Sequence, residues 1–277
     1  MCGIVGYTGF QDAYDIVING LRRLEYRGYD SAGIVLEDKN NNFEVKKTKG
    51  KVSDLVDISE NLKGTSHIGM GHTRWATHGV PSDRNSHPHV SNDGKIALVH
   101  NGIIENYDTI KTMLIGKGFT FLSETDTEVL VNLIQYILDT QNVDFPQAVR
   151  YALNEVYGAY AITVMHKDYP GVLVVGRLGS PLAIGLGDKE YFIASDASPF
   201  VEFTKEAVYL EDGHMATISL EKGVDIRSIK ENEKIEPAIQ ELKVSLEQIE
   251  KGGYEHFMLK EIFEQPKSIQ DTLRGRL

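Results

Sequence analysis

Short runs of apolar, β-branched and aromatic residues recur along the chain, and each run is bounded by Gly, Asp or Asn, which is typical of strands. The runs predict strands at residues 4–7, 32–36, 43–47, 96–100, 159–165, 172–175, 191–195 and 215–220. Early strands, then helices, then many more strands do not form a regular βαβ alternation. This order favours antiparallel sheets with helices outside them, in an α+β fold.

Two segments repeat their apolar residues at three- and four-residue spacing, which is the period of a helix. The first covers residues 13–24, ahead of Gly28, and the second covers residues 129–138. Thr125 and Glu128 predict a capping box at the start of the second helix. A third helix is expected over residues 145–156.

The composition of the 277 residues, 41% hydrophobic and 25% charged, is typical of a globular protein with a substantial core. The net charge of −11 weighs against binding to nucleic acid or to anionic lipid. No stretch approaches the roughly 20 apolar residues of a membrane span, and the N-terminus lacks the basic flank of a signal peptide. A single cysteine fits a reducing compartment. We therefore expect a cytoplasmic protein with no nucleic-acid or membrane partner.

The last part of the chain differs in character from the rest. Residues 231–277 are charged and helix-prone, with unevenly spaced apolar residues and a Gly252-Gly253 pair. We expect a domain over residues 1–240 and a linker over residues 241–277 that leads toward a further C-terminal portion.

Cys2 follows the initiator methionine, and its small size normally permits removal of Met1. The product would carry a thiol and a free α-amine on one residue. A thiol of pKa near 8.5 needs a base, and an α-amine of pKa about 7.7–8.0 can serve as that base. The ordinary alternative is a small apolar residue at the start of a strand, which is the commoner role of a free cysteine. Gly3 and Gly6 would leave the backbone around the thiol open.

Five sequence blocks carry a family resemblance. They are MCGIVG at residues 1–6, LRRLEYRGYDSAG at 21–33, HTRWATHG at 72–79, HNGIIEN at 100–106 and SETDTE at 123–128. In this order they resemble the class II glutamine amidotransferases, which are N-terminal nucleophile hydrolases. The resemblance runs from residue 1 to residue 277 and is strongest to the amino-sugar-forming members. It implies a four-layer αββα sandwich of two antiparallel sheets.

The resemblance also implies a pocket for L-glutamine. Arg74 would hold the α-carboxylate, with Trp75, Thr77 and His78 lining the same pocket, and Asp126 would pair with the α-ammonium. Arg74 has an ordinary alternative as a solvated surface residue, and Trp75 has one as a core residue. Asp126 alternatively serves only the dipole of the helix that it begins. Burial of Asp126 would argue against that alternative, because a carboxylate serving only the dipole has no need to be buried.

Asn101 and Gly102 would form the oxyanion hole, with one donor from a side-chain amide and one from a backbone N–H. The alternative is a plain Asn-Gly hairpin turn after the strand at residues 96–100. His87-Pro88-His89 resembles a pair of metal ligands, but neither an accompanying cysteine ligand nor a His-x-x-x-His helix supports it. The resemblance implies no metal and no cofactor.

The implied reaction is hydrolysis of glutamine to glutamate and ammonia through a thioester on Cys2. In the amino-sugar-forming members, ammonia passes to a C-terminal portion that acts on fructose 6-phosphate, and the full-length form can be a homodimer. Three alternatives stay open at this point: a class II amidotransferase of purine, asparagine or glutamate synthesis, a noncatalytic glutamine sensor or interaction domain, and a general hydrolase with a Cys–His pair. A retained Met1 would favour the sensor.

Overall fold

The computed structural model describes residues 2–76, 79–242 and 254–273. The chain divides into two compact units, residues 1–241 (unit 1) and residues 242–277 (unit 2). In the described part of unit 2, one helix, α7 (Phe257–Leu273), contains Pro266 in its interior. Among the described residues, no helix combines the length and the apolar character that crossing a bilayer requires.

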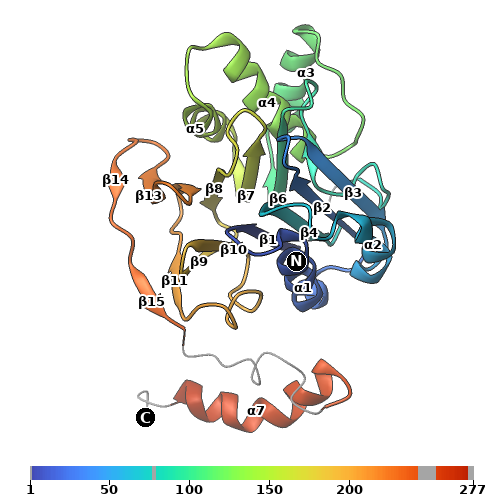
Figure 1. The fold of residues 1–277 in the computed structure, drawn as a ribbon, viewed down its shortest axis with the longest axis vertical. Helices are drawn as coiled ribbons and strands as arrows, with labels where there is room; N and C mark the ends of the chain where they lie inside the picture. The colour runs from blue at the N-terminus through green and yellow to red at the C-terminus, as the bar shows by residue number, and fades with distance from the viewer. Residues whose placement is uncertain (1, 77–78, 243–253, 274–277) are drawn as a thin grey trace. The chain divides into compact units, whose positions relative to one another are not determined.

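Unit 1 is built around two sheets in which neighbouring described strands run antiparallel (Figure 1). The first sheet has eight strands in the order β15 (Ile239–Glu241), β11 (Glu206–Tyr209), β9 (Ala183–Gly187), β10 (Glu190–Ala194), β1 (Gly3–Thr8), β4 (Ile68–Arg74), β2 (Ser31–Glu37) and β3 (Phe43–Lys49). The second has seven in the order β14 (Lys234–Ile235), β13 (Gly223–Ser228), β12 (His214–Ser219), β8 (Leu173–Leu178), β7 (Gly158–His166), β6 (Ile96–Ile104) and β5 (His89–Val90).

Helices cover the outer face of each sheet (Figure 1). On the eight-stranded sheet lie α1 (Ala13–Leu24) and α2 (Val52–Ser59), followed by the short 3₁₀ turns η1 (Glu25–Arg27) and η2 (Glu60–Leu62). On the seven-stranded sheet lie α4 (Asp126–Thr140) and α5 (Phe145–Glu155), and α3 (Tyr107–Gly116) packs against α4. The predicted α+β fold, a four-layer αββα sandwich, is confirmed.

The sheets are held together by one apolar layer between them. Ile4 of β1, Met70 of β4 and Val99 of β6 belong to this layer and are each fully buried. All six residues of β1 are buried, because its other face packs against α1. The strand that begins next to Cys2 is therefore fixed on both faces.

One local prediction, the capping box at the start of α4, needs correction. The helix at residues 126–140 has Thr125 as its N-cap, whose hydroxyl accepts from the Glu128 N–H. The Glu128 carboxylate does not return to the Thr125 N–H, as a capping box requires, but accepts from the N–H groups of Leu122 and Ser123. The carboxylate thus holds the preceding loop instead of closing the box.

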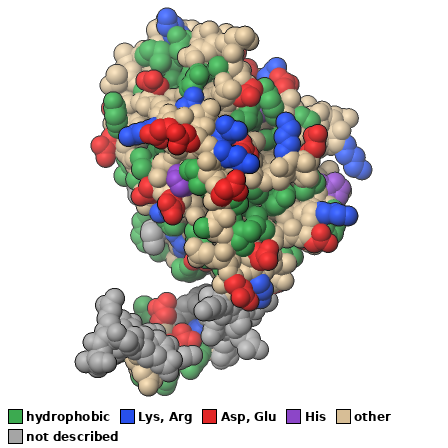
Figure 2. Space-filling view, turned by 90° about the vertical axis from the view of Figure 1, so that its left-hand side faces the viewer, with side chains coloured by type: hydrophobic (Ala, Val, Ile, Leu, Met, Phe, Trp, Pro, Cys, Tyr) green, Lys and Arg blue, Asp and Glu red, His purple; other side chains and the backbone are tan. Residues whose placement is uncertain are grey.

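Figure 2 shows the surface of one face of unit 1. Lys and Arg side chains are interspersed with Asp and Glu side chains on this face. Neither sign of charge gathers there into one continuous patch.

Candidate functional site

A small cavity opens where the start of β1, the end of β4, the middle of β6 and the start of α4 meet. It is lined by Cys2, His72, Arg74, Trp75, His87, His100, Gly102, Thr125, Asp126 and Thr127. Its volume of about 20 Å³ admits roughly one water molecule.

Cys2 lies next to a strand start that tolerates no side chain. Gly3 pairs with Thr73 of β4, and a Cβ at Gly3 would lie 2.6 Å from Thr73 Oγ1 and 2.7 Å from Leu24 Cβ. The next residue is tied down as well, because the Ile4 N–H donates to Ser195 Oγ at 3.1 Å. The backbone beside Cys2 is thus held against β4 and α1.

The Cys2 thiol contacts the backbone of Trp75. The Trp75 N–H donates to Sγ at 3.2 Å, and Sγ lies 3.5 Å from the Trp75 carbonyl oxygen. Burial raises the pKa of the Cys2 thiol above its ordinary value, and the Trp75 N–H opposes this only in part. The thiol therefore stays protonated at neutral pH unless a base removes its proton.

Asn101 and Gly102 lie within β6, opposite Ala161 and Tyr160 of β7, so the hairpin-turn alternative is wrong. Gly102 has a φ of +135°, and a Cβ there would lie 1.9 Å from the Ala159 carbonyl oxygen. Only glycine fits this position. The Asn101 amide is buried, and its Nδ2 donates to the Cys2 carbonyl oxygen at 3.2 Å.

Arg74 is the last residue of β4 and is 4% exposed, so the solvated-surface alternative is wrong. Its Nη2 donates to the Gly79 carbonyl oxygen at 3.3 Å. Trp75 follows it and is 47% exposed, so it is not a core residue. Its ring packs edge to face against the Tyr29 ring, with 5.4 Å between the ring centroids. The predicted pocket residues Thr77 and His78 lie outside the described residues.

Asp126 begins α4 and is 5% exposed. Its Oδ2 accepts from the Ile104 N–H at 2.8 Å, while the helix end is capped by Thr125. A role in the helix dipole alone does not account for a buried carboxylate, because burial of a charge costs free energy that a dipole role does not require.

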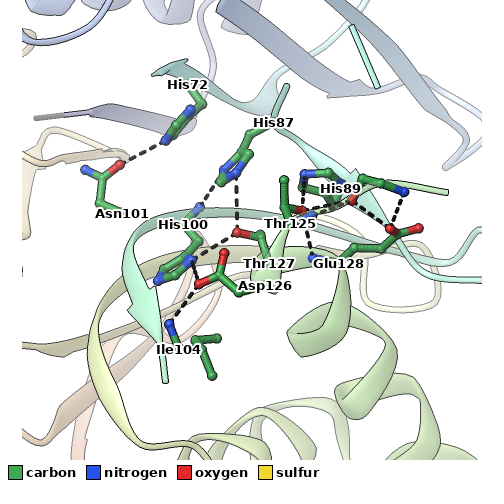
Figure 3. Close-up of polar contacts among 11 residues, drawn as sticks. His72, His87, His89, His100, Asn101, Ile104, Thr125, Asp126, Thr127 and Glu128 are labelled. Carbon is green, nitrogen blue, oxygen red and sulfur yellow. Dashed lines mark hydrogen bonds and ion pairs between the residues drawn. The ribbon is translucent and has the colours of Figure 1, made fainter. Parts of the chain in front are cut away.

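Four buried imidazoles form a network (Figure 3), and three of them, His72, His87 and His100, line the cavity. His72 Nε2 lies 2.9 Å from Asn101 Oδ1. The His72 ring stacks on the His87 ring, with 4.2 Å between the ring centroids. His87 Nδ1 accepts from the His100 N–H at 3.2 Å. His89 Nε2 lies 3.0 Å from the Thr125 hydroxyl. The network joins the end of β4, the loop before β5, β6 and the start of α4.

Burial keeps these imidazoles neutral. It lowers the pKa of His72 to about 3 and lowers the pKa values of His87, His89 and His100 as well. Thr127 shares its hydroxyl between His87 Nε2, at 3.3 Å, and His100 Nδ1, at 3.0 Å. Sequence reasoning did not single out Thr125 and Thr127 as cavity residues, although their alternation in the SETDTE block was a usable signal.

Comparisons with known proteins extend this picture. The sequence profile of the family described as "Glutamine amidotransferase domain" matches residues 56–255, a range that contains Arg74, Asn101 and Asp126 but not Cys2. The glutamine–fructose-6-phosphate aminotransferase (isomerizing) of Bacteroides thetaiotaomicron is 53% identical over 279 residues, covering 100% of this chain and 45% of that protein. The protein of the same name from Chlorobaculum tepidum is 52% identical over 282 residues, with the same coverage.

The fold has a solved counterpart. The glutamine phosphoribosylpyrophosphate amidotransferase from B. subtilis, complexed with ADP and GMP, is 29% identical with a TM-score of 0.70, covering 83% of this chain and 50% of that chain. The chain spans about half the length of the curated relatives that it matches. Since the family profile covers most of its residues, the chain belongs to the glutamine amidotransferase domain family.

Proposed function

We propose that this chain hydrolyses the side-chain amide of L-glutamine to glutamate and ammonia, with Cys2 as the nucleophile. One observation carries the proposal. Cys2, Arg74, Gly102 and Asp126 line a single cavity, and the Asn101 amide is hydrogen-bonded to the Cys2 backbone. A thiol, two candidate oxyanion donors and two buried charges of opposite sign are the groups that glutamine hydrolysis requires.

The two buried charges match the two charges of glutamine. Arg74 is placed to bind the α-carboxylate, and Asp126 uses one oxygen on Ile104, which leaves the other for the α-ammonium. The guanidinium and the carboxylate are thus complementary in charge to the two ends of the amino acid. Trp75, Thr77 and His78 complete the proposed substrate pocket.

The nucleophile requires a base, because burial raises the pKa of the Cys2 thiol. Removal of Met1 would place a free α-amine on Cys2 itself, and an amine of pKa about 7.7–8.0 is suited to accept the thiol proton near neutral pH. This mechanism does not need a histidine as the base, and the buried imidazoles at the cavity have lowered pKa values.

The reaction then follows in two stages. Cys2 Sγ attacks the γ-carbonyl carbon while the Asn101 amide and the Gly102 N–H hold the developing oxyanion. The C–N bond breaks, the α-ammonium of Cys2 returns its proton to the departing nitrogen, and ammonia leaves. Water, deprotonated by the same amine, attacks the γ-glutamyl thioester; the C–S bond breaks and glutamate is released with the thiol restored.

For the longer protein, we propose that residues 1–240 form the glutamine-hydrolysing domain and that residues 241–277 link it to a C-terminal portion. There the ammonia would convert fructose 6-phosphate to glucosamine 6-phosphate. This assignment is supported by the names of relatives more than 50% identical to the chain. We also propose that the longer protein is a homodimer and that it is located in the cytoplasm.

The experiment is a glutaminase assay on the purified chain, with Cys2→Ala as the matched control. We expect glutamate release by the unmodified chain and none above background by Cys2→Ala. Equal rates for the two proteins would overturn the assignment of the nucleophile. Binding of glutamine without any release of glutamate by a chain that lacks Met1 would favour the noncatalytic sensor.

A further inference from the structure

We infer that His72 is a positioning residue for this reaction: its Nε2–H group fixes which end of the Asn101 amide faces the nucleophile. The inference rests on the proposed function, and it assigns a task to a side chain that need not touch the reacting atoms. Asn101 supplies an oxyanion donor only if its NH₂ end, and not its oxygen, lies on the side of Cys2.

The hydrogen bonds determine the orientation of the amide without ambiguity. The Cys2 carbonyl oxygen can only accept, so the end of Asn101 that lies 3.2 Å from it must be Nδ2. The opposite end is then Oδ1, which also can only accept. Because Oδ1 lies 2.9 Å from His72 Nε2, that nitrogen must carry the hydrogen. A single imidazole tautomer thus matches a single amide orientation.

The other ring nitrogen agrees with this tautomer. His72 Nδ1 is buried, and within the part of the chain that the structure describes it makes no hydrogen bond of normal distance and angle. An unprotonated ring nitrogen at this buried position costs less free energy than an N–H group without an acceptor, since buried N–H donors without a partner are rare in folded proteins. The Nε2–H form of His72 therefore satisfies both the ring and Asn101.

The position of the ring is restrained by a second imidazole. His87 stacks on His72 with an angle of 21° between the ring planes. His87 is itself fixed, because its Nδ1 accepts from the His100 N–H, so its Nε2 carries the hydrogen and donates to Thr127. His72 is fully buried and neutral over the working pH range, so it acts through the place of one hydrogen and not through charge.

Loss of this donor would leave Asn101 Oδ1 buried without a partner and would free the amide to rotate. The rotated amide directs its oxygen toward the developing oxyanion, which is repulsive. The α-carboxylate and α-ammonium contacts of glutamine do not involve Asn101. We therefore expect kcat to fall and KM to change little.

The test uses His72→Leu, which removes the donor, and His72→Gln, whose amide nitrogen can donate from a similar place. We expect His72→Leu to lower kcat about 10- to 100-fold, below the roughly 10²–10³-fold cost of losing an oxyanion donor outright. His72→Gln is expected to stay within about fivefold of the parent chain. His166→Leu removes another buried imidazole that does not line the cavity, and it serves as the control for loss of a buried histidine.

A double-mutant cycle separates positioning from general damage. In an Asn101→Ala background, His72→Leu should cause less than about a twofold further loss of kcat, because the group that it positions is gone. Independent, multiplicative losses would overturn the inference, as would His72→Gln being as inactive as His72→Leu. Nitrogen NMR of the parent chain gives a readout that does not depend on folding of a variant: we expect a neutral His72 with hydrogen on Nε2, and hydrogen on Nδ1 would overturn the inference. Equal turnover by the parent chain and Cys2→Ala would instead refute the proposed function.

Discussion

The proposed pairing of Asp126 with the glutamine α-ammonium can be tested by one near-isosteric change. In Asp126→Asn, the side-chain oxygen can still accept from the Ile104 N–H, so the hydrogen bond of 2.8 Å that holds this side chain is kept. Only the charge is lost. The contact with the ammonium then changes from a charge-assisted hydrogen bond to a neutral or repulsive one.

The expected magnitude follows from burial. Asp126 is 5% exposed, so solvent screens its interaction with a bound ammonium only weakly. Hydrogen bonds to charged groups contribute about 1.5–3 kcal/mol, and each 1.4 kcal/mol is a factor of ten in affinity. We therefore expect Asp126→Asn to weaken glutamine binding about 10- to 150-fold.

The assay is calorimetric titration of L-glutamine into the Cys2→Ala chain, which binds without turnover, with and without Asp126→Asn. Asp168→Asn is the control, because Asp168 is an exposed carboxylate whose salt bridge to Lys95 lies outside the cavity. An affinity within about twofold of the parent for Asp126→Asn would refute the reasoning. So would an equal loss for Asp168→Asn.

Three further predictions concern other described residues. Asn101→Ala should lower kcat about 10²–10³-fold with little change in KM in steady-state assays, and a pure KM effect would contradict its role. Gly102→Ala should lower the free energy of unfolding by at least about 2 kcal/mol in urea titrations, because its Cβ would overlap the Ala159 carbonyl at a positive φ; wild-type stability would contradict this geometry. Burial raises the pKa of Glu37 from 4.5 to about 7, so folding favours the protonated carboxyl group. The free energy of unfolding therefore falls as the pH rises from about 4.5 through about 7 and this group ionises. Glu37→Gln should therefore raise Tm more at pH 8 than at pH 5, and an equal shift at both would contradict the assignment.

The sequence predicts the well-patterned elements and misses those whose pattern is weak. All eight predicted strands overlap observed ones, α1 and α4 follow their apolar repeats, and α5 covers the third expected helix. The central strand β4 was not predicted. Its sequence, IGMGHTR, mixes glycine and polar residues, which lowers strand propensity, although it is buried throughout between β1 and β2. Tertiary packing, and not propensity, makes it a strand.

At the candidate site, too, the sequence predicts the residues better than their tertiary contacts. The choice of Cys2, Arg74, Asn101 and Asp126 came from chemistry and family resemblance, and the fold brings these residues together at one cavity or in contact beside it. The Asn-Gly pair is a strong turn signal locally, yet β6 continues through it because β7 supplies a partner for every residue. The sequence places His72, His87 and His100 near the pocket as hydrogen-bonded residues, but it does not predict their hydrogen-bonding pattern, because that pattern depends on which ring nitrogen meets which acceptor.

The most direct test of the central claim is mass spectrometry of the chain after acid quench during turnover of glutamine. We predict that the active chain begins at Cys2 and carries, on that residue, an added mass equal to glutamine minus ammonia. Full turnover by a chain that retains Met1, or an adduct on any other residue, would contradict the claim that sulfur and base belong to the same first residue.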